Sequence, residues 1–355
     1  MFTLLNDPTF PSLSEEHKPF VNETVMEVCG VTRPLAVSKL RHNGDVDILG
    51  SDVDPIMPTK ALVRDFLDRL PYTAPCVPAD SELRHEVADL IASWNAGVSW
   101  KYIEGLAETS CSIAESAYAH TSHEHQRMVA IYTACLTLAD DLGHHNMEAL
   151  GQFVGRFTRG EPQLHPALDC LVKLLGTLHE FCPRINADAI IASTVDSVSA
   201  MYIEVLSQGD VISPFATKYP FYFRIKTGIA PAYAHLNFTK SWGDDIGTYY
   251  LQLLPEFELV VVGFNDILSF YKETLAGETD NYVNMRAAVE QKQAISVLRQ
   301  LIEENLDSVY KLRQLAAPQP GLTEIFLGFL MGYVEFHFKA RRYRLHEIIA
   351  EVDEQ

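Results

Sequence analysis

The residues best suited to chemistry lie in the stretch 263–273, which reads GFNDILSFYKE. Asn265, Ser269 and Glu273 are spaced four residues apart, so on a helix their side chains form one stripe. Amide, hydroxyl and carboxylate oxygens are hard ligands, and this combination suits a magnesium ion. Lys272 lies near the same line, where its ammonium group can hold a phosphate that the metal also contacts. A solvated polar face is the alternative, but the mostly apolar flanking residues argue against it.

A second candidate is the carboxylate pair Asp140-Asp141, which follows the apolar run 131–139. Two carboxylates at the C-terminal end of a helix oppose the helix dipole, and a bound cation would relieve that cost. The pair alone is weak support for a metal site, because adjacent acids also occur at helix ends without a ligand.

A third candidate lies near the C-terminus, where three arginines surround Tyr343 in the sequence RRYRL, 341–345. Guanidinium groups bind phosphates through paired hydrogen bonds, so this segment can form a phosphate clamp. A solvated, ion-paired face is the alternative. The largely apolar sequence just upstream, with Tyr333, Phe336 and Phe338, favours the clamp.

Helices must position these groups, because apolar residues recur at helical spacing from residue 79 onward and no clear hairpin signal occurs. Ser81, Ser122 and Asn186 precede acidic first turns and are predicted caps. We predict helices at about 60–70, 82–95, 98–119, 123–141, 146–158, 165–181, 186–207, 220–236, 246–275, 283–314 and 321–351. The proline-rich start predicts an irregular arm over 1–58, and the rest predicts one all-α domain over 59–355.

Composition limits the partners. The chain has 355 residues, 47 acidic against 28 basic, and a formal net charge of −19. This balance argues against nucleic acid, which needs a basic surface. The 47% share of hydrophobic residues excludes a disordered chain. Six scattered cysteines without metal-site spacing favour reduced thiols and a cytoplasmic protein. No basic, apolar leader or membrane-spanning apolar run is apparent.

Together, the three motifs resemble those of class I terpene cyclases, specifically the fungal trichodiene synthase family. That superfamily pairs an aspartate-rich motif with an Asn-Asp-x-x-Ser-x-x-x-Glu motif on an α-helical bundle around a central apolar cavity. The second motif is complete here, and the resemblance covers about residues 85 to 351. It implies that three Mg²⁺ ions hold a prenyl diphosphate. The implied metal ligands are Asp140, Asn265, Ser269 and Glu273.

The resemblance also assigns the groups that donate to the diphosphate. Arg224, in the sequence FRIKTG at 223–228, is implied to be the diphosphate sensor, and Arg342 and Tyr343 to be the Arg-Tyr pair. Lys272 is expected to donate as well. Asp141 is a possible further metal ligand, but we expect it to pair with Arg342 when the site closes.

One position departs from the family pattern. His144 stands where the aspartate-rich motif usually has its last acid, and we interpret it as an ordinary residue at the start of a loop. The resemblance then predicts a magnesium-dependent sesquiterpene cyclase that ionises farnesyl diphosphate. The alternatives are a chain-elongating prenyltransferase, which would carry a second Asp-Asp-x-x-Asp motif, and a non-catalytic helical isoprenoid binder. A homodimer is possible.

Aromatic side chains near the motifs are candidates for stabilising a carbocation by cation–π contact, although most are expected to pack in the core. They are Tyr132, Tyr222, Phe223, Trp242, Phe264, Tyr333 and Phe336.

Overall fold

The computed structural model describes residues 55–75, 77–141, 143–242 and 249–349, and every regular element in these ranges is a helix. The first seven helices are α1 (Ile56–Arg69), α2 (Ser81–Ser93), α3 (Trp100–Ala117), α4 (His123–Asp141), α5 (Met147–Arg159), α6 (Pro166–Phe181) and α7 (Arg184–Leu206). The next elements are α8 (Tyr219–Thr227), α9 (Ala230–His235), η1 (Lys240–Trp242), η2 (Tyr249–Gln252) and α10 (Leu254–Ala276). The last are α11 (Tyr282–Glu290), α12 (Ala294–Ala316), α13 (Pro320–Lys339), η3 (Arg341–Tyr343) and α14 (His346–Ile349).

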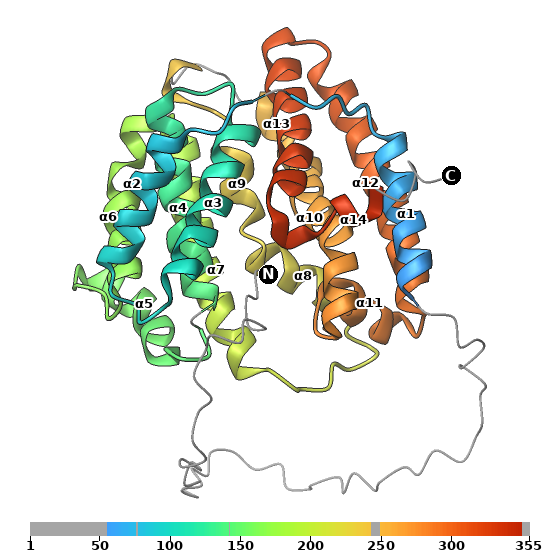
Figure 1. The fold of residues 1–355 in the computed structure, drawn as a ribbon, viewed down its shortest axis with the longest axis horizontal. Coiled ribbons are helices and arrows are strands. Elements are labelled where there is room, and N and C mark those ends of the chain that lie inside the picture. Colours follow the sequence, from blue (N-terminus) through green and yellow to red (C-terminus); the bar gives the residue numbers. More distant parts are fainter. Residues whose placement is uncertain (1–54, 76, 142, 243–248, 350–355) are drawn as a thin grey trace, which may run out of the picture.

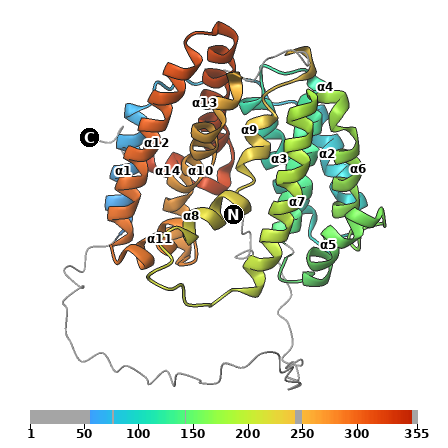
Figure 2. The same cartoon turned by 180° about the vertical axis from the view of Figure 1, so that it is seen from behind.

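The helices form one bundle with its long helices roughly side by side (Figures 1 and 2). α2, α4, α5 and α6 make one side, α1, α11 and α12 make the other, and α3, α9, α10 and α13 lie between them. α3 packs against α4 and α13, and α9 packs against α7 and α10. The predicted all-α class is therefore confirmed. The predicted arm at 1–58 falls mostly outside the described residues; α1, which begins at Ile56, packs against α10 and α12.

Two predicted helices are each two helices in the structure. The predicted helix at 220–236 breaks between α8 and α9, where Ile229 has a φ of 53°. At Gly228 a Cβ atom would lie 2.6 Å from Val262 Cγ1, so this chain crossing needs glycine. The predicted helix at 283–314 breaks between α11 and α12, where Gln291 has a φ of 54°.

Two further predictions of helix bounds were wrong. α10 begins at Leu254, not 246, because Pro255 suits only the first turn of a helix; residues 246–248 lie outside the described residues. The last predicted helix, 321–351, ends at Lys339. The chain then turns through η3, with Arg344 at a φ of 58°. This turn folds Tyr343 back onto α10, where its ring is buried.

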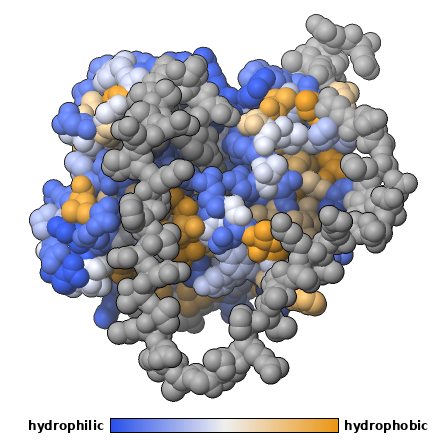
Figure 3. Space-filling view, turned by 90° about the horizontal axis from the view of Figure 1, so that it is seen from below, coloured by the Kyte–Doolittle hydropathy of each residue, from blue (hydrophilic) through white to orange (hydrophobic). Residues whose placement is uncertain are grey.

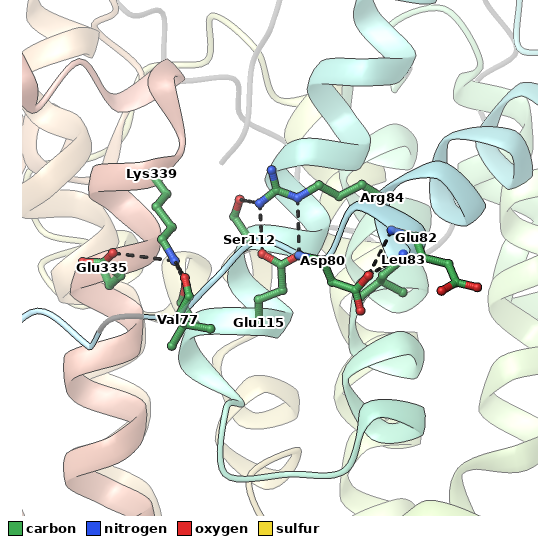
Figure 4. Close-up of polar contacts among 10 residues, drawn as sticks. Val77, Asp80, Glu82, Leu83, Arg84, Ser112, Glu115, Glu335 and Lys339 are labelled. Atoms are coloured by element: carbon green, nitrogen blue, oxygen red, sulfur yellow. Dashed lines mark hydrogen bonds and ion pairs between the residues drawn. The ribbon is translucent and has the colours of Figure 1, made fainter.

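Polar contacts fix the segment that joins α1 and α2 as it crosses α13 and α3 (Figure 4). Lys339 Nζ donates to Val77 O at 2.7 Å, and the main-chain N–H of Asp80 donates to Glu115 Oε1 at 2.9 Å. Arg84 Nη2 donates to the buried Glu115 carboxylate at 2.9 Å. Asp80, rather than the predicted Ser81, caps α2.

Buried polar residues join the middle helices elsewhere. Ser122 caps α4 as predicted, since the main-chain N–H of His125 donates to its Oγ. Asn186 is not a cap but lies inside α7, where its Nδ2 donates to His235 Nδ1 at 3.1 Å. Its Oδ1 accepts from Tyr250 Oη at 3.1 Å. The four cysteines within the described ranges, Cys111, Cys135, Cys170 and Cys182, are free thiols.

In the described part of the chain, α7 alone is long and apolar enough to cross a membrane by length and composition. The same criterion selects core helices of soluble proteins, so it is weak support for a membrane span. α7 packs against α5, α6, α8 and α9, which gives it a place in the bundle.

α13 approaches the main chain of α3 very closely at Gly332. A Cβ atom at Gly332 would lie 1.8 Å from the carbonyl oxygen of Ser116. Gly332→Ala should therefore lower the free energy of unfolding by about 2–3 kcal/mol, because main chain must move to admit the methyl group. Gly328→Ala is the control, since it lies on the same helix with open space around it. Urea unfolding followed by circular dichroism measures both, and equal midpoints for wild type and Gly332→Ala would contradict the packing.

Buried His125 should make the stability of the fold depend on pH. Its Nε2 donates to Leu236 O at 2.8 Å, and burial lowers its pKa from 6.5 to about 4. In the unfolded chain the imidazole of His125 binds a proton below about pH 6.5, whereas in the folded chain it does so only near pH 4. The free energy of unfolding therefore falls by about 1.4 kcal/mol per pH unit as the pH drops through this window. His125→Gln keeps a donor but removes the titration. Its unfolding free energy should fall less steeply than that of wild type from pH 6.5 to 4; parallel curves would refute the assignment.

Candidate active site

The α10 stripe lies inside the bundle. Asn265, Ser269 and Glu273 are 5%, 2% and 6% exposed, respectively, so the alternative of a solvated polar face does not hold. Helical spacing places the three oxygens along one line of α10, as the sequence predicts. Burying three polar side chains in an apolar core is costly unless each has a partner.

Asn265 has three polar neighbours from three different elements. Arg224 Nη2, on α8, donates to its Oδ1 at 3.1 Å. Its Nδ2 donates to Tyr343 Oη, on η3, at 3.2 Å and lies 3.4 Å from Nε2 of His337, on α13. The structure therefore brings three predicted site residues, Arg224, Asn265 and Tyr343, into one hydrogen-bonded cluster.

Arg224 is buried and is neutralised by Asp266. Arg224 Nε donates to Asp266 Oδ1 at 2.7 Å, and the two side chains are 6% and 9% exposed. Burial raises the pKa of Asp266 to about 6, and the guanidinium group of Arg224 opposes that rise. The ion pair holds α8 against α10 and keeps the guanidinium group beside the amide of Asn265.

The other end of the stripe also carries a charge pair. Lys272 Nζ lies 3.3 Å from Glu273 Oε1 and 3.8 Å from Glu278 Oε1. Between the two ends, Ser269 Oγ is buried and has no hydrogen-bond partner. A buried hydroxyl oxygen without a partner, flanked by an amide and a carboxylate on the same line, fits a ligand set for a hard divalent cation.

The aspartate pair Asp140-Asp141, the first motif of the family pattern, ends α4, and Asp141 is buried. Tyr102 Oη, on α3, donates to Asp141 Oδ2 at 2.5 Å. Burial and then the charge of Asp141 raise the pKa of Tyr102 well above its ordinary value, while Arg342 opposes this rise. Tyr102 thus lies within electrostatic reach of both Asp141 and Arg342, although the predicted pairing of those two residues stays a prediction.

The negative charge of Asp140 acts on a second carboxyl group, that of Glu204 on α7. Burial, and then the charge of Asp140, raise the pKa of Glu204 to about 8. A cation bound near these two acids would be stabilised by both. Glu204 also experiences the positive charge of Arg224, so the ends of α4, α7 and α8 belong to one electrostatic environment.

A cavity of about 610 Å³ opens at this end of the bundle, beside the first motif and α8. His144 and Glu204 lie on its wall, as do Tyr219 and Phe223, whose rings stack with centroids 5.6 Å apart. Figure 3 looks onto this end, where patches of apolar side chains interrupt the hydrophilic surface. His144 is exposed, lies in the turn that follows α4 and forms part of this wall; its interpretation as an ordinary loop residue stays a prediction.

Sequence reasoning missed three residues of this cluster: Tyr102, Asp266 and His337. Asp266 adjoins Asn265, but only the fold shows that it pairs with Arg224. His337 is the single histidine in the largely apolar sequence of α13, and this was the available signal. Tyr102 gave none. Of the aromatic candidates, Phe223 lies on the cavity wall. Phe264 instead packs in the core, with its ring centroid 5.0 Å from that of Phe66 on α1.

The Arg224–Asp266 pair yields a stability prediction. Arg224→Met leaves the buried carboxylate without its partner and should cost about 3–5 kcal/mol in the free energy of unfolding. The double variant Arg224→Met/Asp266→Leu removes both charges and should recover most of that loss. Urea unfolding at pH 7 measures the three proteins. An equal loss in the single and double variants would mean that the ion pair does not carry the contact between α8 and α10.

Comparison with known proteins identifies the family. The profile of the trichodiene synthase (TRI5) family matches residues 85–355. The chain is 30% identical over 292 residues to monoterpene synthase 25 of Postia placenta, covering 82% of this chain and 86% of that protein. It is 27% identical over 308 residues to α-cuprenene synthase COP6 of Coprinopsis cinerea, covering 83% and 91%.

A solved structure shares the fold. The crystal structure of linalool/nerolidol synthase from Streptomyces clavuligerus matches with a TM-score of 0.55 at 13% identity, covering 78% of this chain and 97% of that one. At this identity the match concerns the fold alone, which is that of a class I terpene synthase. The family match spans the first motif, the α10 stripe and η3, and the chain therefore belongs to the trichodiene synthase-like family of terpene synthases.

Proposed function

We propose that this terpene synthase ionises farnesyl diphosphate in a magnesium-dependent step, cyclises the allylic cation and releases diphosphate. The observation that carries the proposal is the buried stripe of Asn265, Ser269 and Glu273, with Arg224 and Tyr343 hydrogen-bonded to its first member. Hydrogen-bonding side chains from α8, α10 and η3 meet there, which supports a site for an anionic substrate and a hard cation.

Four side chains would receive the diphosphate: Arg224, Lys272, Arg342 and Tyr343. The negative charge on the leaving oxygen grows as its bond to carbon breaks, so fixed N–H and O–H donors lower the barrier. The ion pair with Asp266 holds Arg224 in position for this task. Burial raises the pKa of Tyr343 to about 12, which keeps its hydroxyl group protonated and able to donate at neutral pH.

Asp140 on α4 and the three stripe residues on α10 would hold three Mg²⁺ ions, with Asp141 as a possible further ligand. When bound, the ions neutralise charge on the diphosphate and so favour its departure. The unpartnered Ser269 Oγ supports this ligand set, as does the interaction between Asp140 and Glu204.

The chain also has to protect the cation. A nucleophile or water would trap it, so the site must exclude both. Histidine can act as a base, but burial lowers the pKa of His337 to about 3, and its Nδ1 donates a hydrogen bond to Tyr333 O. The stacked rings of Tyr219 and Phe223 offer aromatic faces at the cavity, which suit cation–π contact.

The names of relatives bear on the length of the substrate. One relative is named for monoterpene synthesis and another for α-cuprenene, so a shorter substrate, geranyl diphosphate, is the second candidate. The chain-elongating and non-catalytic alternatives stay open to the same test. The cytoplasmic location and the homodimer are predictions from the sequence.

Asn265→Ala and Glu273→Ala should each lower product formation from farnesyl diphosphate and Mg²⁺ by at least about 100-fold, because each removes a ligand for a metal that stabilises the leaving group. Helix content by circular dichroism should stay unchanged. Ser308→Ala, at a buried serine of α12 on the same bundle, is the control and should keep wild-type turnover.

Gas chromatography–mass spectrometry of the products separates the alternatives. Geranyl, farnesyl and geranylgeranyl diphosphates are supplied one at a time, with and without EDTA. The proposal expects cyclic hydrocarbons or alcohols from farnesyl diphosphate that disappear with EDTA. An elongated diphosphate would support the prenyltransferase instead, and no product from any substrate would support the binding protein.

A further inference from the structure

The geometry points to His337 as a positioning residue that fixes which way the amide of Asn265 faces, and we propose that it thereby holds Asn265 Oδ1 toward the ligand site. The inference rests on the proposed function only where it names a metal as the ligand. The orientation of the amide follows from hydrogen bonds within the chain.

The first step is the tautomer of His337. This side chain is fully buried on α13, and its Nδ1 lies 2.7 Å from the carbonyl oxygen of Tyr333, one turn earlier. A carbonyl oxygen can only accept, so Nδ1 must carry the proton. In the neutral ring Nε2 then has a lone pair and can only accept.

The second step is the amide. His337 Nε2 lies 3.4 Å from the amide end of Asn265, so the group facing it must be the NH₂ group. On the opposite side, Arg224 Nη2 at 3.1 Å can only donate, so the group facing it must be the carbonyl oxygen. Tyr343 Oη accepts from Nδ2 at 3.2 Å, but a hydroxyl group can donate or accept and so permits either orientation.

A flipped amide would create two mismatches. Its oxygen would face the lone pair of His337 Nε2, and its NH₂ group would face the guanidinium group of Arg224. Both contacts are buried, and an opposed polar pair in the core is destabilising because water cannot satisfy either group. Neighbouring rings hold the imidazole of His337 in place, since its centroid lies 4.4 Å from that of Tyr343 and 4.7 Å from that of Tyr333.

The consequence concerns ligand binding. Only the oxygen of an amide binds a hard cation, so a flipped Asn265 would present NH₂ to it. Partners that orient a metal ligand typically change affinity by 10- to 100-fold when they are removed. His337→Phe keeps a planar ring but loses the acceptor, so Asn265 should be held from one side only.

The bundle contains a matched control. His235, on α9, accepts from Asn186 Nδ2 through Nδ1 at 3.1 Å, and both residues are buried. His235 is therefore the opposite tautomer, with its proton on Nε2. His235→Phe breaks the same kind of Asn–His bond without touching the α10 stripe.

The first experiment uses the metal-free full-length protein labelled with ¹⁵N-histidine. Long-range ¹⁵N–¹H spectra, assigned with the two Phe variants, should show His337 protonated on Nδ1 and His235 protonated on Nε2. A His337 signal protonated on Nε2, or on both nitrogens at pH 7, would overturn the inference, whatever reaction the protein catalyses.

The second experiment is calorimetric titration of Mg²⁺ in the presence of inorganic diphosphate. Affinity should fall about 10- to 100-fold in His337→Phe and stay within about threefold of wild type in His337→Gln, whose amide oxygen can replace Nε2 as the acceptor, and in His235→Phe. Equal affinities for wild type and a folded His337→Phe would refute the positioning role. If wild type bound no Mg²⁺, the proposed function would fail, and the spectra would still decide the amide orientation.

Discussion

The buried guanidinium group of Arg224 is the constraint on which the site depends. A charge in a helical core must be neutralised and hydrogen-bonded, and Asp266 and Asn265 supply both on adjacent positions of α10. Asn265 in turn contacts η3 and α13 through Tyr343 and His337. Satisfying one buried charge therefore joins α8 and α10 to the C-terminal α13–η3 segment, and the polar side chains of α10 are held as a result.

The breaks in the helices serve the same constraint. Gly228 and Ile229 separate α8 from α9 shortly after Arg224, and both helices pack against α10. At the C-terminus, the chain leaves α13 at Ala340 and turns through η3, which returns Tyr343 to α10. Straight helices at either place would carry these side chains away from the stripe.

The sequence was sufficient for the helices with strong apolar periodicity, and the bounds of α4 are those predicted. It was insufficient at the turns that interrupt the predicted helices: Ile229 and Gln291 adopt a left-handed φ, and the chain leaves α13 after Lys339 to place Tyr343 on α10. Helical spacing identified the α10 stripe, and the family resemblance supplied the sensor arginine. Asp266, His337 and Tyr102 escaped because their roles come from partners on other helices, which no local spacing records.

We expect the aspartate pair, the α10 stripe and the C-terminal turn to enclose one diphosphate. A crystal structure of the wild-type protein with Mg²⁺ and inorganic diphosphate can show this. Asn265 Oδ1, Ser269 Oγ and a Glu273 oxygen should lie on one ion, and Arg224 and Tyr343 should lie within hydrogen-bond distance of the diphosphate. Diphosphate bound away from α10, with the stripe unchanged and without metal, would refute the assignment of the site.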